Sequence, residues 1–432
     1  MASPYNKRQD EAEERVVRGA IMSADDNTLA KTEVSEDGTE IRVYPQNNIF
    51  AHVVGYSNKG RSGLEAIANK DLLNSNETIV AQIEKDIKHE KKHGDTVVTT
   101  LNAKIQKAAY EALGGRYGAV VVMEPKTGKV LAMVSKPDFD PNELPYIWDE
   151  IIADENNSQL LNRATQGMYP PGSTFKTVTA LAYIKEHGTI DDFHFNCTGE
   201  LTIGDHSIRC AGGAVHGEVD FARAFAKSCN GAFAQMGADL GWSSMISTAE
   251  QVMFNGNLPL TLPYYKSKFT TDSHAGTPLL MQTAIGQGDT LTSPMHMAMI
   301  TAAIANGGEL MKPYLVDHIT SVTGENVKNY RPSKYKDLMT YEEALTLQWL
   351  MQKVVEEGTA AALNGNSYTV AGKTGTADHG DMTGPSHSWF IGYSSTSDPD
   401  IVVSIIAEAS VSSGESSVAV PIAQRIFDAY YE

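Results

Sequence analysis

The sequence predicts an α+β fold in which distant parts of the chain supply the strands of one sheet. Short apolar runs typical of strands lie at residues 118–123 and 130–135, and again at three places between residues 367 and 409. Segments whose apolar residues recur at helical spacing fill the middle of the chain. Strands at both ends with helices between them are the pattern expected of an α+β domain.

Composition limits the class of protein. The chain has 432 residues, of which 41% are hydrophobic, so it can bury a large core and form two domains. Its formal net charge is -18, which argues against nucleic acid as a partner because phosphate binding requires basic surface. The sequence has no long apolar run typical of a membrane span and no signal peptide, so we expect the chain as given to be soluble.

The first expected domain covers residues 1–96 and carries no catalytic motif. Its strand-like pieces are "TEIRVYP" at residues 39–45 and "IFAHVVGY" at residues 49–56. A charged helical stretch, "IEKDIKHEKKHGD", leads to a boundary near Asp95. The second expected domain therefore covers residues 97–432.

The second domain begins with cleaner patterns. Residues 103–113 have apolar side chains at helical spacing, and Gly114 ends the pattern. The two strands that follow are joined by the tight turn "EPKTGK". The remaining expected elements are helices at residues 221–241, 293–308 and 418–431, and strands at residues 367–377, 388–395 and 400–409.

The stretch "YPPGSTFK" at residues 169–176 has two interpretations. A helical pattern follows it, and serine is a favoured residue at a helix start, so on this stretch alone a structural Ser173 is the simpler reading. Alternatively, Ser173 is a nucleophile and Lys176, one turn on, is its base. That role requires a neutral lysine, which burial or a second positive charge would favour.

Two further motifs decide between these interpretations. Ser-x-x-Lys, followed along the chain by Ser-x-Asn and Lys-Thr-Gly, is the signature of penicillin-binding proteins and related β-lactamases. The chain has "STFK" at 173–176, "SCN" at 228–230 and "KTGT" at 373–376. Chance copies occur at residues 333–336 and 126–128, but the first has no helix start and the second precedes the nucleophile and lies in a turn.

The chain resembles the penicillin-binding proteins, and within them the monofunctional (class B) transpeptidases of the penicillin-binding protein A type. The likeness runs from Arg18 onward and includes "NRATQGMYPPGSTFK" and "IGQGDTLTSPMHMAMITAAIANGG". It implies a penicillin-binding fold, with an antiparallel sheet flanked by helices, a helical subdomain and a small N-terminal domain of the pedestal or dimerisation kind. It also implies an N-terminal membrane anchor outside this chain and a place on the extracellular face of the membrane.

The resemblance implies a role for each motif residue. Ser173 would attack the carbonyl of a D-Ala-D-Ala stem peptide, and Lys176 would take its proton. Ser228 would relay a proton to the leaving D-alanine, and Asn230 would hold the donor amide. Lys373 would supply the positive field. The substrate carboxylate would be held by the rest of the third motif, Thr374, Gly375 and Thr376, and the backbone N–H groups of Ser173 and Thr376 would form an oxyanion hole.

Cofactor and cysteine predictions stay open at this point. The expected reaction requires no cofactor. Asp378 and His379, just beyond the third motif, together with Cys229 inside the second, are a set that suits zinc. The alternative is a solvated polar loop and a buried small thiol. Cys197 and Cys210 bracket an expected hairpin and could be bridged outside the cell.

The expected partners are stem peptides as donor and amine acceptor, β-lactam antibiotics, and a glycosyltransferase at the N-terminal domain. Three rival functions remain. A β-lactamase or a β-lactam sensor would share the fold and the acylation step, but a β-lactamase needs an additional base, for which no acidic motif stands out. A D,D-carboxypeptidase differs only in accepting water, and the motifs do not separate the two. A scaffold with a retired site would not need all three motifs intact.

Overall fold

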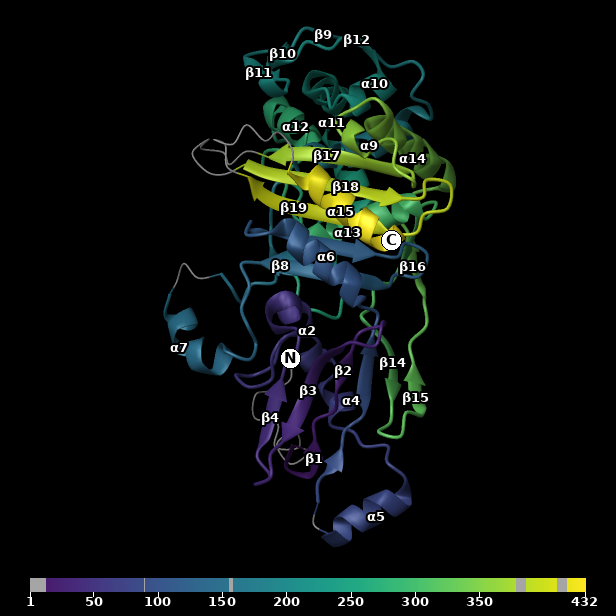
Figure 1. Cartoon of the computed structure of the whole chain (residues 1–432). Helices are drawn as coiled ribbons and strands as arrows, with labels where there is room; N and C mark the ends of the chain where they lie inside the picture. Colours follow the sequence, from purple (N-terminus) through teal and green to yellow (C-terminus); the bar gives the residue numbers. More distant parts are fainter. Residues whose placement is uncertain (1–12, 89, 155–157, 378–385, 410–417) are drawn as a thin grey trace. The chain divides into compact units, whose positions relative to one another are not determined.

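The computed structural model describes residues 13–88, 90–154, 158–377, 386–409 and 418–432 (Figure 1). The chain forms two compact units, each assembled from several segments. The first unit combines residues 1–107, 129–162 and 314–332, and the second combines residues 108–128, 163–313 and 333–432. No helix of the described residues is long and apolar enough to cross a membrane.

The first unit is built on a sheet of six strands in the order β15–β14–β6–β2–β3–β4. Four come from the beginning of the chain: β2 (Ile21–Met22), β3 (Thr28–Val34), β4 (Glu40–Val43) and β6 (Thr96–Thr99). The other two, β14 (Val316–Thr320) and β15 (Asn326–Asn329), come from much later in the sequence. β14 pairs antiparallel with β6, which places Ile319 opposite the buried Val97.

The remaining elements of the first unit are short. They are β1 (Val16–Val17), η1 (Asn47–Phe50), α2 (Ala51–Val54), α3 (Gly63–Ile67), α4 (Asn69–Leu72), α5 (Ile79–Lys88), β5 (Lys92–His93), β8 (Val130–Lys136) and α7 (Leu144–Ala153). Helix α6 (Ala103–Leu113) spans the boundary along the chain between the two units.

The strand predicted at residues 49–56 is wrong, because this segment is helical. Asn47 has a φ of 48° and opens the turn η1, which continues into α2. All four residues of α2 are buried, so burial in a helix, and not pairing in a sheet, accounts for this largely apolar segment. The strand predicted within residues 39–45 is confirmed as β4, and the first part of the helix predicted over residues 83–95 is confirmed as α5. The later part of that prediction is wrong, because residues 92–93 form strand β5.

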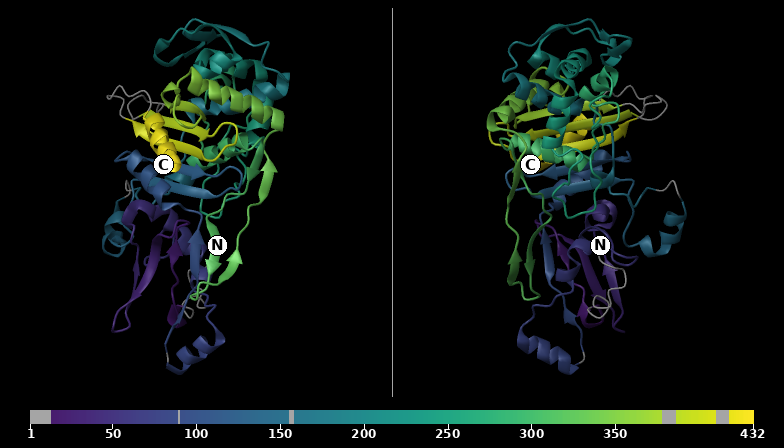
Figure 2. Two further views of the ribbon diagram at one scale, coloured as in Figure 1. Left: turned by 45° about the vertical axis from the view of Figure 1, so that its right-hand side comes forward. Right: turned by 180° about the vertical axis from the view of Figure 1, so that it is seen from behind.

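The second unit contains the predicted sheet from distant parts of the chain. Strands β17 (Val370–Ala377), β18 (Ser386–Ser394), β19 (Val402–Ala409) and β7 (Gly118–Met123) follow one another in this order, each antiparallel to the next. Helix α13 (Pro294–Ala305) packs on one face of the sheet, and α15 (Ala419–Tyr431) packs on the other (Figures 1 and 2). The predicted α+β fold is confirmed.

A helical part and several small strands complete the second unit. The helical elements are α8 (Arg163–Gln166), η2 (Gly172–Phe175), α9 (Lys176–His187), α10 (Phe221–Ala226), α11 (Asn230–Gln251), α12 (Thr277–Ala284), α14 (Tyr341–Glu356), η3 (Ala211–Gly213) and η4 (Ala361–Leu363). The small strands are β9 (His194–Cys197), β10 (Glu200–Ile203), β11 (His206–Arg209), β12 (Gly217–Asp220), β13 (Glu309–Met311) and β16 (Lys334–Asp337). Helix α14 lies beside β17 (Figure 1), and α9 packs on α11.

The helix predicted at residues 221–241 is broken in the middle. The structure has two helices, α10 and α11, and the residues between them include Ser228, which has a φ of 58°. This left-handed conformation is rare for a residue with a side chain, and it cannot continue an α-helix. The break therefore places the Ser-Cys-Asn motif at a corner between two helices.

Candidate active site

The first motif lies on a short turn that leads into α9. Ser173 is within η2, and its carbonyl accepts a hydrogen bond from the backbone N–H of Lys176, the first residue of α9. The N-cap positions of the two helices are occupied by Pro171 and Phe175, so Ser173 caps neither of them. The interpretation of Ser173 as a helix cap is therefore wrong, and its side chain is partly exposed.

Three neighbouring segments hold this turn in place. The Gly172 N–H donates to Gly286 O at 2.9 Å, and a Cβ on Gly286 would lie 1.9 Å from Gly172 O. A Cβ on Gly172 itself would lie 2.5 Å from Thr376 O, so β17 approaches the turn as closely. The Trp389 Nε1–H donates to Pro170 O at 3.0 Å. Only glycine permits backbone approaches this close, so Gly172 and Gly286 are packing positions.

Lys176 is fully buried and reaches the second motif. Its Nζ donates to the Ser228 carbonyl at 2.7 Å, to Ser228 Oγ at 3.1 Å and to Asn230 Oδ1 at 2.7 Å. The Phe233 ring centroid lies 5.5 Å from the same nitrogen. The two residues on either side of Cys229 thus direct their oxygens at one ammonium group.

Lys373 approaches the same serine from the sheet. It lies on β17 with no exposed surface, and its Nζ donates to Ser228 Oγ at 3.0 Å and to Thr374 O at 3.0 Å. The structure therefore brings the second and third motifs together with the lysine of the first, around Ser228 Oγ. Of the other third-motif residues, Gly375 and Thr374 are buried, Thr374 Oγ1 contacts Thr359 Oγ1, and Thr376 is exposed.

Burial changes the protonation of both lysines. Burial lowers the pKa of Lys176 to about 7. Burial, followed by the charge of Lys176, also holds the pKa of Lys373 well below its ordinary value. Two ammonium groups that share one hydroxyl repel each other, so the pair titrates as a unit and carries less than two charges near neutral pH. A lysine that is partly neutral near pH 7 has the property that a general base needs.

The chance copies of the motifs lie in different surroundings. Ser333 immediately precedes β16, and no helix of the described residues starts there. Lys126 lies in the turn after β7, where its exposed Nζ pairs with Asp398. Lys126 is exposed and Lys336 is only partly buried, so neither copy repeats the fully buried lysines of the site.

The cysteines form a group that the sequence analysis did not foresee. Cys229 lies beside Cys197, Cys210 and His216, and one ligand atom from each of the four lies within 4.8 Å of all the others. These four residues could hold a metal. Asp378 and His379, the other predicted zinc ligands, lie outside the described residues, so that ligand set stays a prediction. The missed signal was the concentration of all three cysteines between the first and third motifs, with His216 among them.

Comparisons with known proteins agree with this arrangement. Residues 118–428 match the family model of the penicillin-binding protein transpeptidase domain, and residues 18–97 match that of the penicillin-binding protein A dimerisation domain. The chain is 32% identical to the peptidoglycan D,D-transpeptidase PbpA of Mycolicibacterium smegmatis, over 94% of this chain and 87% of that protein.

Solved structures give the same result. The D,D-transpeptidase domain of a peptidoglycan glycosyltransferase from Eggerthella lenta superposes with a TM-score of 0.87 at 32% identity, covering 96% of this chain and 98% of that one. Penicillin-binding protein A from M. tuberculosis, as its imipenem acyl-enzyme complex, gives a TM-score of 0.87 at 28% identity over 97% and 100% of the two chains.

The chain therefore belongs to the penicillin-binding protein transpeptidase family, and it is a serine D,D-transpeptidase of peptidoglycan synthesis. Within that family it is a class B protein of the penicillin-binding protein A type, with the dimerisation domain that accompanies this type.

Proposed function

We propose that Ser173 is the nucleophile of a two-step acyl transfer. In the first step Ser173 Oγ attacks the carbonyl between the two D-alanines of a donor stem peptide, and the terminal D-alanine leaves as the acyl-enzyme forms. In the second step an amine of another stem peptide takes the acyl group and makes the cross-link. This reaction is balanced without a cofactor, since each step exchanges one acyl bond for another.

We assign the proton transfers to the groups around Ser228. Neutral Lys176 takes the Ser173 proton, and Ser228 relays a proton to the departing D-alanine nitrogen. Lys373 supplies positive charge that disfavours protonation of Lys176. The observation that carries this proposal is the position of Ser228 Oγ, which accepts from Lys176 at 3.1 Å and from Lys373 at 3.0 Å.

The substrate contacts follow from the third motif and the turn. The Asn230 side chain holds the donor amide, and Thr374, Gly375 and Thr376 hold the terminal carboxylate. The backbone N–H groups of Ser173 and Thr376 form the oxyanion hole, and loss of one such donor typically costs roughly 3–4 kcal/mol. The close approach of Gly172 to Thr376 supports this pairing of backbone groups.

The wider organisation is also a proposal. Residues 1–96 act as the non-catalytic dimerisation or pedestal domain, and residues 97–432 act as the transpeptidase domain. The enzyme works on the outer face of the bacterial membrane, where stem peptides are found, and the N-terminal domain is a candidate docking place for a glycosyltransferase. β-Lactams acylate Ser173 because they resemble the D-Ala-D-Ala end.

The test is the intact mass of the protein after incubation with benzylpenicillin. We expect one stable adduct per chain in the wild type and none in Ser173→Ala. Ser333→Ala, which removes the serine of the chance Ser-x-x-Lys copy, is the matched control and should keep the adduct. An adduct that persists in Ser173→Ala would overturn the assignment of the nucleophile. Steady hydrolysis of nitrocefin over many turnovers would instead favour a β-lactamase.

A further inference from the structure

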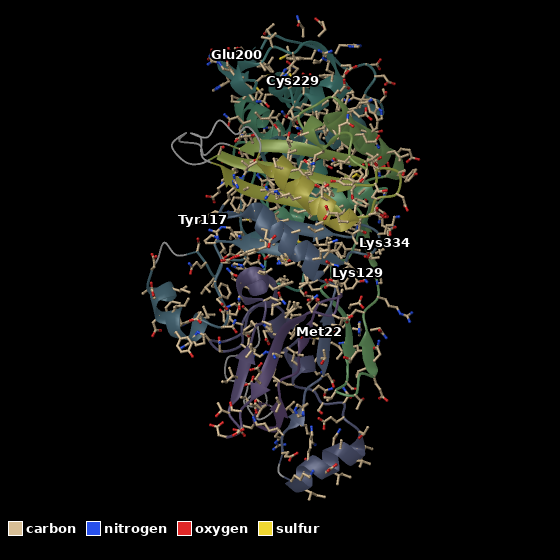
Figure 3. All side chains as sticks on the ribbon, in the orientation of Figure 1. Met22, Tyr117, Lys129, Glu200, Cys229 and Lys334 are labelled. Atoms are coloured by element: carbon tan, nitrogen blue, oxygen red, sulfur yellow. The ribbon has the colours of Figure 1, made fainter. Side chains whose placement is uncertain are left out.

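Four ligand-type side chains meet beside the second motif. They come from the end of β9 (Cys197), the residue after β11 (Cys210), the segment before β12 (His216) and the residue before α11 (Cys229). All three cysteines are buried free thiols. Figure 3 labels Cys229 within the second unit and Glu200 on the neighbouring hairpin.

The distances within this cluster match the edges of a tetrahedron around a metal. Cys197 Sγ lies 3.7 Å from Cys210 Sγ, which lies 3.8 Å from Cys229 Sγ. Cys197 Sγ also lies 3.3 Å from His216 Nδ1. Thiolates bound at about 2.3 Å to one tetrahedral Zn²⁺ lie about 3.8 Å apart, and a thiolate and an imidazole nitrogen lie about 3.5 Å apart.

We propose that Cys197, Cys210, Cys229 and His216 bind one zinc ion. Three thiolates and one imidazole fill the four positions of tetrahedral zinc, so the site is closed and structural, with no position left for a substrate. On binding, each of the three thiols gives up its proton to solvent, and the site carries one net negative charge.

Hydrogen-bond donors already face the sulfur atoms. The Ala232 N–H donates to Cys229 Sγ at 3.5 Å, and the backbone N–H groups of Asn230 and Gly231 are directed at Cys210 Sγ. Such donors orient and stabilise thiolate ligands in metal sites. The cluster therefore has ligands and a surrounding shell, both supplied by this chain.

The local fold needs a cross-link of this kind. The hairpin of β10 and β11 has no buried residue, and β9 and β12 bury one residue each, Cys197 and Val219. A segment with so little apolar core gains its stability from disulfides or metals more than from packing. A Cys197–Cys210 disulfide would supply one link but would leave Cys229 and His216 outside it, whereas zinc uses all four groups.

Zinc would also position the second motif, an effect that rests on the proposed function. Cys229 lies between Ser228 and Asn230, whose side chains both accept from Lys176. The Asn230 Nδ2–H donates to Arg209 O at 2.8 Å, next to Cys210. Two ligands of the metal are thus adjacent in sequence to groups that hold the motif, and Cys229 acts as a positioning residue for it.

The primary test measures metal and thiols in protein purified without chelators or an affinity metal. We expect about one zinc per chain by elemental mass spectrometry, the stoichiometry of a closed structural site, and three free thiols after denaturation. Replacement of zinc by Co²⁺ should give the visible absorption of tetrahedral thiolate coordination. Protein purified without metal would overturn the proposal. This holds whether its intact mass corresponds to three free thiols or is lower by two hydrogens, as a disulfide requires.

Variants connect the metal to the four residues. His216→Ala and Cys210→Ser each remove a ligand, so they should weaken zinc binding by more than the roughly 10–100-fold that loss of an outer-shell partner causes. His206→Ala, which removes an exposed histidine from the same hairpin, should keep full zinc and is the matched control. Unchanged zinc affinity in both ligand variants would overturn the assignment of the site.

Acylation gives a separate readout. If zinc positions the second motif, its loss should slow acylation by benzylpenicillin by up to roughly a hundredfold, because small displacements of catalytic groups have effects of that size. If the protein binds zinc but Ser173→Ala is still acylated, the proposed nucleophile is contradicted and the proposed metal site is not. If Ser173 is acylated in a protein that contains no zinc, the metal site is contradicted and the proposed nucleophile is supported.

Discussion

The two units bury charge in opposite ways. In the first unit, Glu65 is completely buried, and its two oxygens accept from Arg18 Nε at 2.6 Å and Arg42 Nε at 2.7 Å. In the second unit, Lys176 and Lys373 are as deeply buried, but within the described residues neither forms an ion pair. Their acceptors are neutral hydroxyl, amide and carbonyl oxygens.

The pKa directions show what this difference means. Burial raises the pKa of Glu65, but the charges of Arg42 and Arg18 more than offset it, so the carboxyl stays ionised and structural. Burial lowers the pKa of both lysines, and for Lys176 the opposing charge effects of Cys229 and Cys210 offset the shift only in part. A buried charge that is paired with opposite charges stays fixed and serves the scaffold, whereas a buried charge without an ion pair is found at sites that exchange protons.

The largest effect that tests this comparison is on the rate of acylation. Lys176→Met should slow acylation by benzylpenicillin by roughly 10²–10⁴-fold, because the general base is removed. The free energy of unfolding should change by no more than about 2 kcal/mol, since the methionine fills the same volume and leaves only neutral acceptors unpaired. Stopped-flow measurement with a fluorescent penicillin, and urea unfolding, would give the two values.

Lys185→Met is the matched control for this variant. Lys185 lies on the same helix with its side chain exposed, so its removal should leave the acylation rate unchanged. If Lys176→Met were acylated as fast as Lys185→Met, then Lys176 would not be the base.

The next effect is on stability in the first unit. Glu65→Gln keeps the shape of the side chain but leaves Arg18 and Arg42 without their anion, so unfolding should become easier by roughly 3–5 kcal/mol. The acylation rate of the molecules that remain folded should not change. Glu33→Gln breaks the exposed pair with Lys31, which should be worth less than about 1 kcal/mol, and serves as control. If Glu65→Gln proved as stable as Glu33→Gln, the buried ion pairs of Glu65 would not stabilise the first unit.

Local patterns predicted most elements but could not predict their long-range connections. Apolar spacing indicated α9 and α13, and alternation and apolar runs indicated strands β17 to β19, because each depends only on neighbouring residues. The pairing of β14 with β6 depends on a register between distant segments, which no local pattern encodes. Helical spacing also continues through residues 221–241, so it concealed the break at Ser228.

The candidate site shows the same limit. Motif order and context separated the residues around Ser228 from the chance copies, since chemistry restricts which residue types occur there. Spacing could not show that Lys176 and Lys373 would meet at one hydroxyl, or that Cys229 would lie beside Cys197. Those facts follow from how α9, β17 and α11 pack.

The smallest expected effect is a shift of a pH profile, and it tests whether the two lysines share charge. Acylation should accelerate as pH rises through about 7, the pKa of Lys176, because only the neutral amine can accept the Ser173 proton. Lys373→Met removes the neighbouring charge, so the pKa of Lys176 should rise and the inflection of the residual rate should move up by about one unit or more. Lys126→Met, the chance copy in the exposed turn, should leave the inflection in place. An inflection that also stays in place in Lys373→Met would show that burial alone tunes Lys176, and the field proposed for Lys373 would then have to act on the substrate carboxylate.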